Sequence, residues 1–205
     1  METFTILLTM VAAWHVLRVR YQKARVTLLG QHLADLQLEK HMQTLTEGYS
    51  RAIHESDPDR QIQIFKTFAD TENAVARQVQ ALSASIHNEQ EQSTRMGVLP
   101  FCIPYVEVAF PFLTRDFRRL LQIHATGLQH IVDNNDQLSV KDRAFHLSAE
   151  LYLLQHSCHW FCKSRAVADA RLVVRHKVNY QKVLESVSDV TRLGYMAWFK
   201  NSGRH

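Results

Sequence analysis

The longest helical repeat in this chain runs from residue 139 to residue 172 and reads SVKDRAFHLSAELYLLQHSCHWFCKSRAVADARL. Its apolar positions recur at alternating spacings of three and four, which is the pattern of an amphipathic helix with one buried stripe. The stripe consists of Val140, Ala144, Leu147, Leu151, Leu154, Cys158, Phe161, Arg165, Ala168 and Leu172. Ser139 followed by Asp142 predicts the helix start. Because the stripe needs partner helices, it predicts a bundle.

A second repeat follows Asp57 and Pro58, which predict an N-cap and a first helical position. Its seam has heptad spacing and consists of Phe65, Phe68, Glu72, Val75, Val79, Leu82 and Ile86. We expect Glu72 to lie at the solvent-exposed edge of the seam, the alternative being an acid that fixes the register of the helices. The partner of the seam is either the preceding helix, in an antiparallel hairpin, or a second copy of the chain.

Composition supports the helical class. The 205 residues include only 6 glycines and 4 prolines, too few for the turns of an all-β fold, and 46% hydrophobic residues exclude general disorder. We therefore expect an all-α fold, a long-helix bundle with coiled-coil-like hairpins. Three cysteines, Cys102, Cys158 and Cys162, form no C-x-x-C pair and leave one over, which argues against a disulfide framework and favours a reducing compartment.

No charged side chain occurs from Thr3 to Leu17. As a helix, residues 1–19 would measure about 28 Å, close to the roughly 30 Å of a bilayer core. Basic residues follow at once, and these are Arg18, Arg20, Lys23 and Arg25. Since Lys and Arg stay on the cytoplasmic side, we expect a single-pass membrane anchor with the body in the cytoplasm. The alternatives are a buried helix of a soluble bundle and an interfacial helix. A cleaved signal peptide is disfavoured, because Glu2 is the only side-chain charge before the apolar stretch.

The rest of the chain divides into three parts. Residues 20–95 are expected to form a helical hairpin, in which the anchor helix runs on from Arg18 to about Ser56. Residues 96–113 form a proline-rich apolar connector. Residues 114–200 form a basic helical region that packs with the hairpin.

Three prolines prevent the connector from forming one regular helix, and its only charge is Glu107. We expect it to pack over the bundle with one short helical turn near Tyr105 to Ala109. The alternatives are a loop that enters the bilayer beside the anchor and a surface that binds a partner. Thr114 predicts the N-cap of the next helix.

Potential metal ligands are densest at His156, His159 and Cys162. On a helix these residues are neighbours one turn apart, so two or three of them could reach one zinc or haem iron. His146 and Glu150 have a spacing of four that di-iron bundles also use, but the chain lacks the Glu-x-x-His motif of those sites. We therefore expect this pair to be an ordinary exposed one.

Residues 115–205 hold 14 Lys and Arg against 8 Asp and Glu. If one helix continues through this region, Arg171, Arg175 and Lys182 share a face that could meet anionic lipid, as could the basic flank of the anchor. The pattern argues against nucleic acid as a partner, because no aromatic residues are interleaved with these cations.

The chain contains no phosphate-binding glycine loop, nucleophile elbow or zinc-protease helix, so its sequence indicates no reaction and leans against an enzyme. We expect a membrane-anchored, cytoplasmic interaction or scaffold protein that self-associates through its heptad seams. The alternative is a helical-bundle protein that binds a metal or haem near His156, His159 and Cys162.

Overall fold

A computed structural model describes residues 2–200 and shows an all-α protein. Eleven α-helices, one short 3-10 helix and one two-stranded ribbon make up this described part. The predicted fold class is confirmed, whereas the coiled-coil-like hairpins are not.

The first helices are α1 (Glu2–Leu33), α2 (Leu38–Ile53), α3 (Pro58–Lys66), α4 (Ala69–His87) and α5 (Glu91–Thr94). Then come β1 (Arg95–Gly97), α6 (Val106–Ala109), the 3-10 helix η1 (Pro111–Leu113) and β2 (Thr114–Asp116). The chain continues with α7 (Phe117–Val132), α8 (Val140–Cys162), α9 (Arg165–His176), α10 (Tyr180–Ser186) and α11 (Asp189–Lys200).

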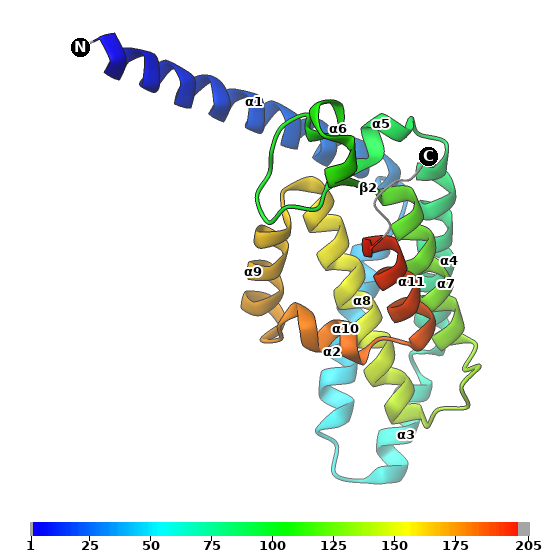
Figure 1. The fold of residues 1–205 in the computed structure, drawn as a ribbon. Coiled ribbons are helices and arrows are strands. Elements are labelled where there is room, and N and C mark those ends of the chain that lie inside the picture. Colours follow the sequence, from blue (N-terminus) through cyan, green and yellow to red (C-terminus); the bar gives the residue numbers. More distant parts are fainter. Residues whose placement is uncertain (1, 201–205) are drawn as a thin grey trace.

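Helix α8 runs through the middle of the body and contacts α1, α2, α3, α7, α9 and α10 (Figure 1). Helix α4 packs between α2 and α7, and α11 packs on α7. Helix α1 is different, because its buried residues all lie in its second half while its first half projects away from the body. The N-cap predicted for α8 is present, since Ser139 Oγ accepts the N–H of Asp142 at 3.1 Å.

The continuous helix predicted from Arg18 to Ser56 is wrong, because the chain turns at residues 34–37. In this turn the N–H of Leu36 donates to the carbonyl oxygen of Leu33 at 3.0 Å. The change of direction lets α2 bury Leu38 and the following apolar residues of its stripe.

The heptad seam after Asp57 packs against other helices of the same chain. Asp57 caps α3 as predicted, and its Oδ1 accepts the N–H of Asp59 at 2.9 Å. The seam is split between α3 and α4 at residues 67–68. The part of the seam on α4 packs between α2 and α7. Its apolar residues are at most 1% exposed, and they are Val75, Val79, Leu82 and Ile86.

Glu72 does not lie at a solvent-exposed edge, so that prediction is wrong. Its side chain is 3% exposed and pairs with the guanidinium of Arg143 in α8 at 2.8 Å. The hydroxyl of Tyr49 in α2 donates to the same carboxylate at 2.5 Å. The buried acid therefore joins three helices, α2, α4 and α8.

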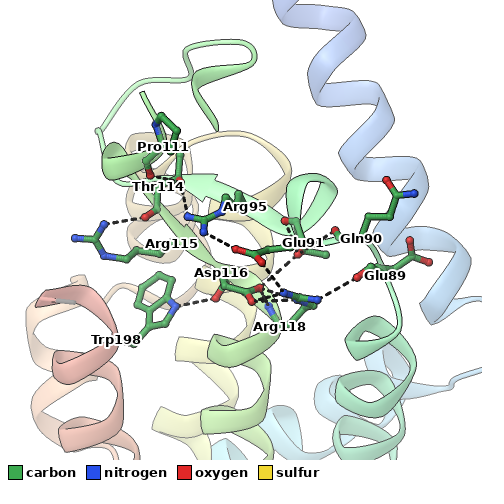
Figure 2. A network of polar contacts seen from close by, with 11 residues as sticks. Glu89, Gln90, Glu91, Arg95, Pro111, Thr114, Arg115, Asp116, Arg118 and Trp198 are labelled. Atoms are coloured by element: carbon green, nitrogen blue, oxygen red, sulfur yellow. Dashed lines mark hydrogen bonds and ion pairs between the residues drawn. The ribbon is translucent and has the colours of Figure 1, made fainter. Parts of the chain in front are cut away.

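The two strands, β1 and β2, lie at the two ends of the connector. They pair antiparallel, with Gly97 opposite Thr114, so Thr114 is a strand residue and not the predicted cap. Asp116 caps α7 instead, and it accepts the N–H of Arg118 at 2.9 Å. Figure 2 shows the surrounding network, in which the guanidinium of Arg118 also pairs with Asp116 at 2.8 Å and Trp198 of α11 donates to the Asp116 carbonyl at 2.8 Å.

Candidate functional site

The first half of α1 is exposed on every side. Its large apolar side chains are 46–72% exposed, and they are Phe4, Ile6, Leu7, Leu8, Met10, Val11, Trp14, Val16, Leu17 and Val19. The helix is long and apolar enough to cross a membrane, and its most apolar stretch has no contact that buries it in the body. A helix with apolar side chains all round is typical of a membrane span or of a core helix, and here no core surrounds it.

Three of the four basic residues after this stretch lie at the surface. Arg20 and Lys23 are exposed and Arg18 is half-buried. Arg25 is only 7% exposed, so its predicted role as a lipid-facing residue is wrong. The reason is that α1 enters the body at Tyr21, and one face of the helix is covered from there on.

Arg25 joins α1 to three other elements. Its guanidinium donates to the carbonyl oxygen of Phe161 at the end of α8 at 3.1 Å and to the carbonyl oxygen of Arg95 in β1. It also lies 3.8 Å from the carboxylate of Glu107 in α6. The rings of Tyr21 and Phe161 cover the guanidinium, with centroids at 4.3 Å and 4.9 Å. A buried cation with several acceptors and two aromatic faces fixes the direction of α1.

Glu107 completes this contact from the connector. The hydroxyl of Tyr21 donates to its carboxylate at 2.6 Å, and burial raises the pKa of the Tyr21 phenol, so it stays a donor. The rings of Tyr21 and Tyr105 meet edge to face at 5.2 Å. We call the five residues Tyr21, Arg25, Tyr105, Glu107 and Phe161 the α1 socket.

Sequence reasoning missed Tyr21 and Glu107 as functional residues. A signal was available for Glu107, because a lone charge in an apolar segment requires a partner once it is buried. No comparable signal distinguishes Tyr21 from the other aromatic residues of the chain.

The connector presents apolar side chains next to the α1 socket. Five of them are 48–61% exposed, namely Phe101, Tyr105, Val108, Phe110 and Phe112, and we call them the connector patch. The segment holds the short helix expected near Tyr105 to Ala109, which is α6. Its ends are fastened, because Val98 N–H donates to the Leu113 carbonyl at 2.9 Å and Ala166 N–H of α9 donates to the Pro100 carbonyl at 2.9 Å.

The two histidines predicted to bind a metal have other partners. His156 Nε2 lies 2.7 Å from Asp169 Oδ1, and the guanidinium of Arg171 donates to His159 Nδ1 at 3.0 Å. Burial, with Arg171 nearby, lowers the pKa of His159 to about 4, and burial raises the pKa of the Cys162 thiol to about 11. Across the described chain, no three His, Cys, Asp or Glu side chains gather as a metal ion requires. A three-ligand metal site is therefore not assembled at His156, His159 and Cys162 in the described chain.

Glu150 is not part of an exposed pair with His146, so that prediction is wrong. Its side chain is fully buried and accepts hydrogen bonds from the N–H of Ser188 at 3.0 Å, from Ser188 Oγ at 2.7 Å and from Thr191 Oγ1 at 2.9 Å. His146 Nδ1 lies 2.9 Å from the carbonyl oxygen of Ser186 instead. Since Ser188 Oγ also accepts the N–H of Thr191, Glu150 holds the start of α11 against α8.

The predicted basic face is divided between two helices. Helix α9 ends before Lys177, which has a left-handed backbone with φ 56°, and Lys182 belongs to α10. The single face with Arg171, Arg175 and Lys182 is therefore wrong. Arg171 and Arg175 stay together on α9, one turn apart and exposed.

Comparisons with protein-family models, with curated proteins and with solved structures find no match to this chain.

Proposed function

We propose that this chain is a membrane-anchored α-helical protein whose first 19 residues span the bilayer and whose body acts as an interaction or scaffold element in the cytoplasm. The observation that carries the proposal is the uncharged part of α1 from Thr3 to Leu17, which stands exposed outside the bundle. The free energy of transfer from water to hydrocarbon is favourable by about 1.5–3 kcal/mol for each of its large apolar side chains. A bilayer is the environment that satisfies this stretch without a second protein.

The charges beside this stretch support the orientation. Arg18 and Arg20 lie between the apolar stretch and the body, and Lys23 is exposed on the first turn of α1 that packs on the body. Glu2 is the only charged side chain on the other side of the stretch, and acidic residues contribute little to topology. The positive flank therefore favours a cytoplasmic body.

The body has a defined structure, because buried polar groups connect its helices. Arg25, Glu72, Glu150 and His156 each connect two or more helices. Such contacts fix the relative positions of the helices, as an interaction or scaffold element requires.

Membrane fractionation of the full chain tests the anchor. We expect the protein to stay in the membrane pellet after an alkaline wash. The double substitution Leu8→Arg and Val11→Arg should move most of it to the soluble fraction, because each central arginine costs roughly 2.5–3.5 kcal/mol of insertion free energy. The control substitutes two exposed apolar residues of the body, Ile62→Arg and Leu193→Arg, and should stay in the pellet. Alkaline release of the unmodified chain would overturn the proposal.

Protease digestion of sealed vesicles tests the orientation. A protease added to the cytoplasmic face should degrade the body, whereas a protease added to the opposite face should leave it intact. The reverse pattern would show that the positive flank does not set the topology.

A further inference from the structure

We propose that the connector patch inserts into the interfacial layer of the same bilayer that α1 spans, so that the body rests on the membrane surface. The inference depends on the proposed function, because it requires α1 to lie in a bilayer. It adds a second membrane contact, made by a segment that is distant from the anchor in sequence.

The first argument is depth. Tyr21 lies four residues after Leu17, which is about 6 Å along a helix. The headgroup layer adds roughly 5–7 Å on each side of the hydrocarbon core. Because the ring of Tyr105 touches the ring of Tyr21, the connector lies at headgroup level when Leu17 reaches the edge of the core. This is the layer in which aromatic side chains accumulate.

The second argument is rigidity. Glu107 in the connector bonds to Tyr21 and pairs with Arg25, and the pairing of Gly97 with Thr114 closes the base of the segment. Tyr105 has a left-handed backbone with φ 57°, a conformation that residues other than glycine rarely adopt. The socket contacts that hold this conformation also prevent the connector patch from moving away from α1.

The third argument is composition. Five phenylalanines are exposed in the described chain. Three of them lie in the connector, namely Phe101, Phe110 and Phe112, and the other two are Phe4 and Phe145. Phe110 and Phe112 lie edge to face with centroids at 6.2 Å. Apolar side chains gathered on one short segment indicate a contact surface and not a random exposure.

The surrounding charges favour lipid as the occupant of this surface. Arg20 and Lys23 are exposed on the neighbouring turns of α1. Helix α9 starts against the connector at Ala166 and lies on the side of the body toward which α1 projects (Figure 1). It exposes Arg171 and Arg175 farther along, away from the connector. Apolar and aromatic side chains bordered by cations match an anionic bilayer surface.

Spin labels in the full chain test the proposal in vesicles of phosphatidylcholine and phosphatidylserine. Cysteines are introduced singly by Phe112→Cys in the connector patch, Met10→Cys in the anchor and Ile62→Cys on α3, which lies at the opposite end of the body (Figure 1). All three carry Cys102→Ser, and the chain with this change alone gives the background signal. Collisions with oxygen report exposure to lipid, and collisions with a water-soluble nickel chelate report exposure to water.

We expect the label at position 112 to collide with nickel several-fold less often than the label at position 62, and to collide with oxygen readily, as the label at position 10 does. If position 112 behaves like position 62 while position 10 is in lipid, the second contact is wrong and the anchor stands. If position 112 is shielded from both reagents, a protein covers the patch and the proposal is also wrong. If position 10 collides freely with nickel, the anchor and the second contact fail together.

Discussion

The carboxyl group of Glu150 ionises near neutral pH because its side chain is fully buried. Burial raises its pKa from 4.5 to about 7, and hydrogen bonds from Ser188 and Thr191 oppose part of this rise. Between these two values the folded chain keeps a proton that the unfolded chain has released. The contribution of Glu150 to stability is therefore greatest below pH 4.5 and decreases as the pH rises to 7.

Replacing Glu150 by Gln should remove this dependence on pH. Relative to the unmodified chain, Glu150→Gln should gain roughly 1 kcal/mol in free energy of unfolding for each unit between pH 5 and pH 7. Urea denaturation at a series of pH values measures this difference. A difference that stays constant over the range would show that Glu150 does not titrate there.

The contribution of His124 to stability should instead decrease as the pH falls. Burial, helped by the nearby His156, lowers its pKa from 6.5 to about 3, and its Nε2 lies 2.8 Å from Ser157 Oγ. Below pH 6.5 the unfolded chain takes up a proton that folded His124 does not, so stability falls as the pH falls toward 3. His124→Gln should lose roughly 2 kcal/mol less stability than the unmodified chain between pH 6.5 and pH 5, measured by the same denaturation series. An equal loss in both proteins would contradict this assignment.

Among the elements, α7 and α11 approach each other closely at Gly127. A Cβ atom at this position would lie 1.7 Å from Thr191 Oγ1 and 3.2 Å from Glu150 Oε1. The missing side chain therefore makes room for the hydrogen bond between Thr191 and Glu150, which holds α11 in place.

Gly127→Ala should destabilise the protein by about 1–3 kcal/mol, because Thr191 must turn away and α11 must shift. Gly30→Ala is the matched control, since Gly30 lies within α1 and a Cβ added there would meet no other part of the described chain within 4 Å. The control should be neutral or stabilising by up to about 1 kcal/mol, through helix propensity alone. Thermal unfolding of both variants gives the comparison, and equal shifts in the same direction would refute the role of the close approach.

The helix ends show which local signals are readable from sequence. Asp57 and Ser139 cap the helices that they were predicted to start, and Asn179 caps α10 by accepting the N–H of Lys182 at 2.9 Å. The break at Ser164, within the predicted helix from residue 139 to residue 172, was missed. Apolar spacing continues across this break, because α8 and α9 both turn their apolar faces toward the same core.

At the scale of the whole molecule, the α1 socket sets how the projecting helix and the body are joined. Arg25 faces the carboxylate of Glu107 and the carbonyl oxygens of Phe161 and Arg95. Removing this one side chain would leave the buried Glu107 carboxylate with the Tyr21 hydroxyl as its only partner among residues 2–200.

Arg25→Met should therefore destabilise the full chain by roughly 3–5 kcal/mol, as expected when one partner of a buried ion pair is removed. Lys23→Met is the control, because Lys23 is exposed on the same helix two residues earlier, and it should change stability by less than about 0.5 kcal/mol. Urea denaturation of the purified chain in detergent measures both. Similar stability of the two variants would show that the α1 socket does not couple α1 to the body.

The sequence by itself determined the helical class, the caps at Asp57 and Ser139, and the uncharged stretch from Thr3 to Leu17. These features depend on residues within a few positions of one another, which one helix or one turn brings together.

Only the tertiary structure decided which polar side chains are buried and where the chain changes direction. Arg25 meets a carbonyl group 136 positions away, and Glu150 meets Ser188 38 positions away. Periodicity identifies the face of a helix that must be covered, but it does not identify what covers it. For this reason Arg25, Glu72 and Glu150 were all expected at the surface and are all buried, because their partners come from distant segments that only the folded chain brings together.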